Sequence, residues 1–157
     1  MHAAASADQR VLAFQITPLN AGEPTVAREY LAGQLPRASL TLADANYDSN
    51  PLHTAMDAHG HTLVTPLRGH CQDPKKRRRM SAGRQRLLRW WDDCPSRCRA
   101  LLKRRGTIER VFANISNFGG SLTCLPPWVR RLPRVTLWVT AKLAIYHARL
   151  ITKKYNP

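Results

Sequence analysis

Short apolar segments and polar breaks alternate along the first 66 residues. Residues 10–17 (RVLAFQIT), 39–43 (SLTLA) and 62–65 (TLVT) are rich in apolar and β-forming side chains. Pro18 directly follows the first segment and Pro66 directly follows the third. Short apolar runs with such boundaries are typical of strands, so we predict three of them.

Two stretches between these segments have helical spacing instead. Val26 and Tyr30 lie four positions apart, which puts them on one face of a helix over residues 25–34. A second helix is expected to begin near Pro51, because proline is tolerated in a first helical turn, and to end at Gly60. The order strand, helix, strand, helix, strand, with short connections, predicts an α/β sheet with crossover helices.

The pattern changes after residue 66. Residues 67–100 show little periodicity before Leu87, which favours a long basic loop with a short helix near residues 85–91. Apolar side chains return at helical spacing from Ile108 to Ile115, and a further helix is expected over residues 134–153. The predicted single domain, residues 1–157, thus has a sheet portion (1–66), a basic loop (67–100) and a helical portion (101–157).

Charge is distributed unevenly over the chain. The 157 residues carry a net charge of +15, with a pI near 10.9. Residues 1–66 contain three Lys/Arg and six Asp/Glu, whereas residues 67–157 contain 22 and four. Such a cationic surface indicates a polyanionic partner, most simply nucleic acid, although a solvated basic surface without a partner is the alternative. The candidate phosphate-binding side chains are Lys75, Lys76, Arg77, Arg78, Arg79, Arg104 and Arg105.

Membrane and targeting signals are weak. The apolar run 135–146 is interrupted by Lys142 and is shorter than the roughly 20 residues of a membrane span. The N-terminus lacks the basic-then-apolar pattern of a signal peptide, so we expect a cytoplasmic protein without membrane contacts. The four cysteines are then ordinary thiols rather than zinc ligands, since Cys94 and Cys98 lack a second matching pair.

Two carboxylates are candidates for chemistry. Asp44 follows the second predicted strand, and open α/β sheets place their sites at such strand ends. Glu109 lies in a basic helical stretch, four residues after Arg105. A turn residue and a surface ion pair are the plain alternatives. Together the two acids would suit Mg²⁺, which binds carboxylate, water and phosphate oxygens.

Several segments resemble bacterial insertion-sequence DDE transposases. Residues 42–49 (LADANYDS) resemble the segment around the second catalytic aspartate of that family, and residues 104–112 (RRGTIERVF) resemble the segment around its catalytic glutamate. Residues 11–20 are similar to the strand and turn before the second aspartate, and residues 117–142 to the C-terminal helices. The segments follow in the order of the family, so the set is more specific than any one segment.

The resemblance implies a partial RNase H-like fold, two-metal catalysis with Mg²⁺ or Mn²⁺, and cleavage and rejoining of DNA at transposon ends and target. Asp44 corresponds to the second acidic ligand and Glu109 to the third. Arg105 matches the arginine of the family. Leu102 stands where the family has tyrosine and Ser116 where it has lysine, so their accessory DNA contacts are not carried over.

The first aspartate of the family has no counterpart here. Only Asp8 precedes residues 10–17, and it corresponds to a turn between strands, so it receives no catalytic role. We therefore expect the C-terminal part of a transposase, inactive alone, and consider both a monomer and a homodimer. The alternatives are a non-catalytic basic DNA-binding protein and an RNA-binding protein.

Aromatic residues give two further expectations. Trp90 and Trp91 could stack on bases beside Arg86 and Arg89, although core packing or self-association is the commoner use of such a pair. Three more aromatic residues near the C-terminus are expected in the core: Trp128, Trp138 and Tyr146.

Overall fold

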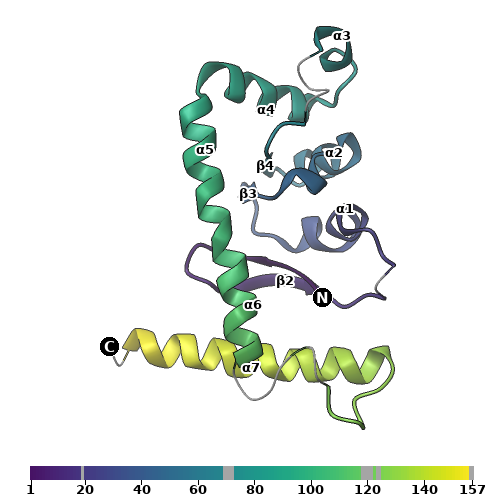
Figure 1. Cartoon of the computed structure of the whole chain (residues 1–157), viewed down its shortest axis with the longest axis vertical. Helices are drawn as coiled ribbons and strands as arrows, with labels where there is room; N and C mark the ends of the chain where they lie inside the picture. The colour runs from purple at the N-terminus through teal and green to yellow at the C-terminus, as the bar shows by residue number, and fades with distance from the viewer. Residues whose placement is uncertain (19, 69–72, 118–121, 123–124, 156–157) are drawn as a thin grey trace. The chain divides into compact units, whose positions relative to one another are not determined.

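The computed structural model describes all residues except 19, 69–72, 118–121, 123–124 and 156–157 (Figure 1). It divides into two compact units. Unit 1 combines Met1–Leu19 with Gly106–Pro157, and unit 2 is Asn20–Arg105.

Unit 1 is a β-hairpin packed with two helices. Strands β1 (His2–Ala5) and β2 (Val11–Gln15) pair antiparallel, and helices α6 (Thr107–Asn117) and α7 (Leu132–Tyr155) supply the rest of the unit. The predicted strand at residues 10–17 and the two predicted C-terminal helices are thus confirmed. We did not predict β1, because its alanine run has no alternation of apolar and polar residues to mark a strand.

An apolar core joins these elements. Val111 and Ile115 of α6 are four positions apart and almost fully buried, and they meet Val139, Leu143 and Tyr146 of α7 in one cluster. Three hydrogen bonds then fix the hairpin to the helices: from the Tyr146 hydroxyl to the Gln9 carbonyl (2.8 Å), from the Val11 N–H to His147 Nε2 (3.0 Å), and from the Asn114 amide to Gln9 Oε1 (3.3 Å).

Unit 2 contains a small parallel sheet. Strands β3 (Leu40–Leu42) and β4 (Thr62–Val64) pair in parallel, and α2 (Asn50–Ala58) is the crossover helix between them (Figure 1). The preceding helical segment consists of α1 (Glu23–Val26), η1 (Ala27–Leu31) and η2 (Ala32–Gln34). These are the alternating elements that the apolar pattern predicted.

The basic segment is more helical than we predicted. The expected loop at residues 67–100 contains α3 (Pro74–Arg77), α4 (Ala82–Asp93) and most of α5 (Pro95–Lys103), which the turn η5 (Arg104–Gly106) follows. In α4, Leu87 and Leu88 are buried while Arg84 and Arg86 bind carboxylates of distant residues. Because these partners are far apart in the sequence, the local pattern gave little sign of the helix.

The α/β class is confirmed, with one difference in the sheet. The described strands form two two-stranded sheets, β1–β2 and β3–β4, and not one mixed sheet. The finer RNase H-like arrangement stays a prediction. No helix within the described residues is both long and apolar enough to span a membrane.

Candidate functional site

Asp44 lies where β3 ends, as predicted. It is the N-cap of the short turn η3 (Ala45–Tyr47), and its Oδ1 accepts a hydrogen bond from the Asn46 N–H at 2.7 Å. Oδ2 has no hydrogen-bond partner in the described part of the chain. The capping bond orients the carboxylate and leaves one oxygen to take a ligand.

Negative charge surrounds the Asp44 turn. Burial and, to a smaller extent, the negative charges of Glu23 and Asp44 together raise the pKa of Tyr47 to about 12. Arg68 binds the turn from outside through Nε, which donates to the Ala45 carbonyl at 2.8 Å. The carboxylates of Glu23 and Asp44 favour a cation at the end of β3, where the Arg68 guanidinium already supplies one positive charge.

The far end of the same turn is anchored by a buried charged cluster. Asp48 is 3% exposed, and its Oδ2 accepts from Arg84 Nη2 at 2.7 Å. Its Oδ1 lies 3.4 Å from Nε2 of the equally buried His53. Burial opposes ionisation of Asp48, but the neighbouring His53 ring and the hydrogen bond and charge of Arg84 outweigh it and lower the pKa to about 2. Asp48 is therefore ionised at neutral pH and ties the Asp44 turn to α4.

Two further contacts hold the start of α4. Asn50 Oδ1 accepts from the Ser81 N–H at 3.3 Å and from Arg84 Nη1 at 3.2 Å. Gly83 approaches Asp57 so closely that a Cβ there would lie 2.8 Å from Asp57 Oδ2. Sequence reasoning missed this network. Its only local sign in the sequence was the polar run Asp48–Ser49–Asn50 at the start of α2.

Glu109 lies in the first turn of α6, where an acid is favoured by the helix dipole. Its side chain is exposed, and its Oε2 would be 3.1 Å from a Cβ placed at Gly106. Glycine at position 106 therefore leaves room for this carboxylate. Glu109 belongs to unit 1 and Asp44 to unit 2.

The donor chemistry of these residues fits a hard divalent cation. Both candidate ligands are carboxylates, and the Oδ2 atom of Asp44 is available in a negative environment. Within the described ranges, no three His, Cys, Asp or Glu side chains gather around a common point. Asp8, the only earlier acid of unit 1, is in the β1–β2 turn, where it accepts from Ser6 and pairs with Arg10.

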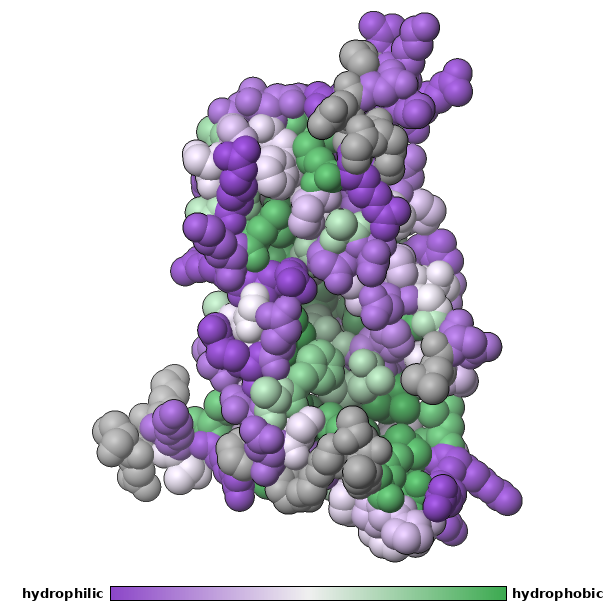
Figure 2. All heavy atoms as spheres, in the orientation of Figure 1, coloured by the Kyte–Doolittle hydropathy of each residue, from purple (hydrophilic) through white to green (hydrophobic). Residues whose placement is uncertain are grey.

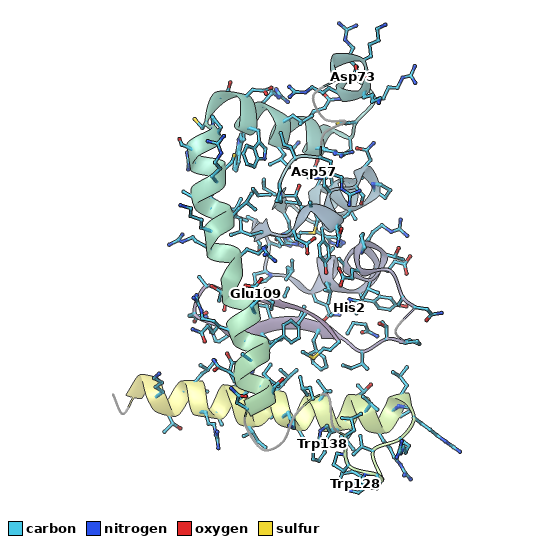
Figure 3. The ribbon with its side chains drawn as sticks, viewed as in Figure 1. His2, Asp57, Asp73, Glu109, Trp128 and Trp138 are labelled. Carbon is cyan, nitrogen blue, oxygen red and sulfur yellow. The ribbon has the colours of Figure 1, made fainter. Side chains whose placement is uncertain are left out.

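The candidate phosphate-binding residues differ in their surroundings. Arg77 makes a bidentate pair with Asp92 (2.5 and 3.2 Å), and Lys76 lies 3.9 Å from Asp73, the residue that caps α3 (Figure 3). The exposed members are Lys75, Lys76, Arg78, Arg79 and Arg104. Figure 2 shows hydrophilic side chains gathered over α3, as an electrostatic surface for a polyanion requires.

The tryptophans only partly follow our expectations. Trp91 packs into unit 2 and donates from Nε1 to the Thr65 carbonyl at 3.1 Å, whereas Trp90 is 40% exposed. Tyr146 is a core residue, as predicted. Trp128 is 60% exposed, so its predicted core position is wrong, because it precedes α7 in a turn and does not lie on the buried helical face.

Within the described residues, the cysteines join no group of three or more side chains that could hold a metal ion. Cys94 is exposed and Cys98 is buried, and burial raises the pKa of the Cys98 thiol. His70, Cys71 and Cys124 lie outside the described residues.

Comparison with known families identifies the class of protein. The family model of the transposase DDE domain matches residues 1–146, almost the whole chain. The chain belongs to this family, which confirms the resemblance found in the sequence and implies a function related to transposition, with DNA as the partner that the family suggests. Neither the curated proteins nor the solved structures that were compared with the chain gave a match.

Proposed function

We propose that the chain acts on transposon-end DNA as part of a catalytic domain for metal-dependent phosphodiester cleavage and strand transfer. The observation that carries this proposal is the place of Asp44, a capped carboxylate at the end of a parallel strand in a chain of the transposase DDE family. An RNase H-like arrangement of the complete domain is part of the proposal.

Asp44 and Glu109 are the proposed ligands of Mg²⁺ or Mn²⁺. When bound, such ions activate the attacking oxygen and stabilise the leaving oxygen of a phosphodiester. The contribution of the chain is to hold the carboxylates. The Asn46 N–H and the Asp48–Arg84 pair fix the two ends of the Asp44 turn, and Gly106 leaves space for the Glu109 carboxylate.

Basic side chains are proposed to hold the DNA backbone. Lys75, Arg78 and Arg79 on and after α3 are exposed to solvent, as is Arg104. Arg77 and Lys76 face Asp92 and Asp73, so we assign them a smaller share of the phosphate contacts. Arg105 completes the proposed set.

Metal binding tests the proposed ligands. Mn²⁺ affinity is measured by calorimetry for the wild-type chain and for Asp44→Asn and Glu109→Gln. We expect each variant to weaken binding and to leave salt-dependent DNA affinity intact or raised, because a negative charge is removed. Glu29→Gln is the matched control, since Glu29 is an exposed carboxylate that pairs with Arg28. Unchanged Mn²⁺ affinity in both site variants would overturn the ligand assignment.

A non-catalytic DNA-binding role is the second candidate. The net charge of +15 and the exposed basic residues around α3 favour it, because they support binding without chemistry. The same titration separates the two roles. A pure DNA-binding protein would keep its DNA affinity and show no change in metal binding when Asp44 or Glu109 is replaced.

A further inference from the structure

A hollow of about 380 Å³ lies at the start of α7 in unit 1. Its lining residues are Arg130, Arg131, Pro133 and Arg134, all of which are exposed. Figure 2 shows hydrophilic side chains projecting from this end of the helix. No carboxylate within the described residues pairs with any of the three arginines, so their charges add within one concave surface.

Backbone carbonyl groups orient two of the three guanidinium groups, those of Arg130 and Arg134. Arg130 Nε donates to the Pro127 carbonyl at 2.9 Å, and Arg134 Nη1 donates to the Trp128 carbonyl at 3.2 Å. Each of these bonds uses one of the five N–H donors of the side chain, so the remaining donors can bind a ligand. Between them, Arg131 has a backbone φ of 65°, a left-handed conformation that is uncommon for residues other than glycine.

An ordered aromatic side chain adjoins the arginines. Trp128 is 60% exposed, and its ring meets that of Trp138 edge-on, with centroids 5.4 Å apart (Figure 3). Trp138 is in turn covered by Lys142, which is 6% exposed and has its Nζ 5.6 Å from the ring centroid. These contacts hold Trp128 while most of its surface stays in solvent.

We propose that this hollow, the α7 arginine pocket, is a second DNA-binding site of the chain. Arginine forks match the geometry of phosphate oxygens, so the three guanidinium groups would bind backbone phosphates. Trp128 would stack on an unpaired base next to those phosphates. The site lies outside the basic residues that the proposed function uses, and it rests on that function only for the choice of DNA as partner.

The salt dependence of DNA binding tests the arginines. In a variant with Arg130, Arg131 and Arg134 all changed to Gln, we expect the slope of log affinity against log salt to fall by roughly 2 to 3 for duplex DNA, at about 0.9 per lost phosphate contact. The control variant changes Arg10, Arg149 and Lys153 to Gln, which removes the same charge from unit 1 outside the pocket. Its slope should stay near the wild-type value. Equal slopes in all three proteins, or equal falls in both variants, would overturn the proposal.

Two further measurements keep the test specific. The corresponding Arg→Lys triple variant keeps the charge, so the slope of log affinity against log salt should stay the same. Its DNA affinity should fall, because lysine lacks the planar guanidinium whose paired N–H groups bind two phosphate oxygens. Trp128→Leu should weaken binding of a single-stranded oligonucleotide by roughly tenfold if one base stacks there. Leu137→Ala changes an exposed apolar side chain of α7 outside the pocket and should leave that affinity unchanged.

The outcomes separate the pocket from the proposed function. DNA binding by the wild-type chain with an unchanged slope in the pocket variant would reject the pocket alone. Competition by polyglutamate as strong as that by an oligonucleotide of equal charge would also reject it, in favour of an acidic protein partner. A wild-type chain that binds no DNA would instead reject the choice of DNA in both proposals.

Discussion

The two candidate metal ligands are supported in different ways in their two units. The turn that carries Asp44 is anchored in unit 2 by buried charged groups, with Asp48 bound to Arg84 and His53. The helix that carries Glu109 is anchored in unit 1 by apolar side chains, chiefly Val111 and Ile115. Buried ion pairing therefore holds the turn that carries Asp44, and packing of buried apolar side chains holds the α6 backbone. The stability of the Asp44 turn should therefore depend on charge and pH, and the stability of α6 should depend on the size of its buried side chains.

Removing Arg84 should give the largest effect. Arg84→Ala leaves the buried Asp48 without its closest cation, so we expect a loss of about 3 to 5 kcal/mol in the free energy of unfolding. Urea denaturation followed by tryptophan fluorescence measures this loss. Arg86→Ala is the control, because the Arg86–Asp57 pair is partly exposed and should contribute about 1 kcal/mol or less. Equal losses in the two variants would show that burial of the Asp48 pair has no special importance.

The matching change in unit 1 is made in its apolar core. Ile115→Ala removes a side chain that is 1% exposed, and we expect a loss of about 3 kcal/mol from lost burial and the cavity left behind. The loss should be the same at pH 3 and pH 7, since the core cluster contains no side chain that titrates between these pH values and the pKa of its Tyr146 is raised above 10.0. Leu137→Ala, at an exposed position of α7, should change stability by less than about 0.5 kcal/mol. A strong pH dependence of the Ile115→Ala loss would contradict the contrast between the units.

Acid should weaken unit 2 through Asp48. The pKa of Asp48 is about 2 in the folded protein against an ordinary value of 3.8, so its contribution to stability is present above about pH 4 and is lost as pH falls toward 2. A shift of this size corresponds to about 2 kcal/mol. Unfolding measured from pH 2 to pH 5 should show the loss in the wild-type chain. In Asp48→Asn the pH dependence should be smaller, and an unchanged profile would show that another carboxylate causes it.

The smallest expected effect is a change in the pKa of Tyr47. Burial is the largest cause of the raised pKa of Tyr47 and remains in Asp44→Asn, so removing the Asp44 charge should lower this pKa only slightly below about 12. Absorbance of tyrosinate during an alkaline titration measures the change, and Tyr47→Phe identifies the signal. Glu29→Gln should leave the pKa as it is.

Local sequence patterns predicted the elements that carry the candidate ligands. The short apolar run at residues 39–43 and the turn residues after it placed Asp44 at a strand end, and the spacing of Ile108, Val111 and Ile115 predicted α6. These features depend on neighbours within a few positions, which is why they can be read without the fold. The order of motifs along the chain likewise sufficed to suggest the family that the comparison confirmed.

Only the tertiary structure decided how these elements are held. The partners of Asp48 and Asp57 lie 36 and 29 residues away on α4, and they stabilise a helix that the sequence pattern indicated only in part. The alanine-rich β1 is a strand because it pairs with β2. Trp128 lies in a turn before α7, and its contact with Trp138 of that helix has no sign in the periodicity of the sequence. Periodicity records which side of an element is apolar, whereas buried ion pairs and strand partners depend on the path of the whole chain. The sequence by itself thus determined most of the elements and the family. Only the tertiary structure brought Arg84 to Asp48 beside the Asp44 turn and grouped the arginines of the α7 arginine pocket.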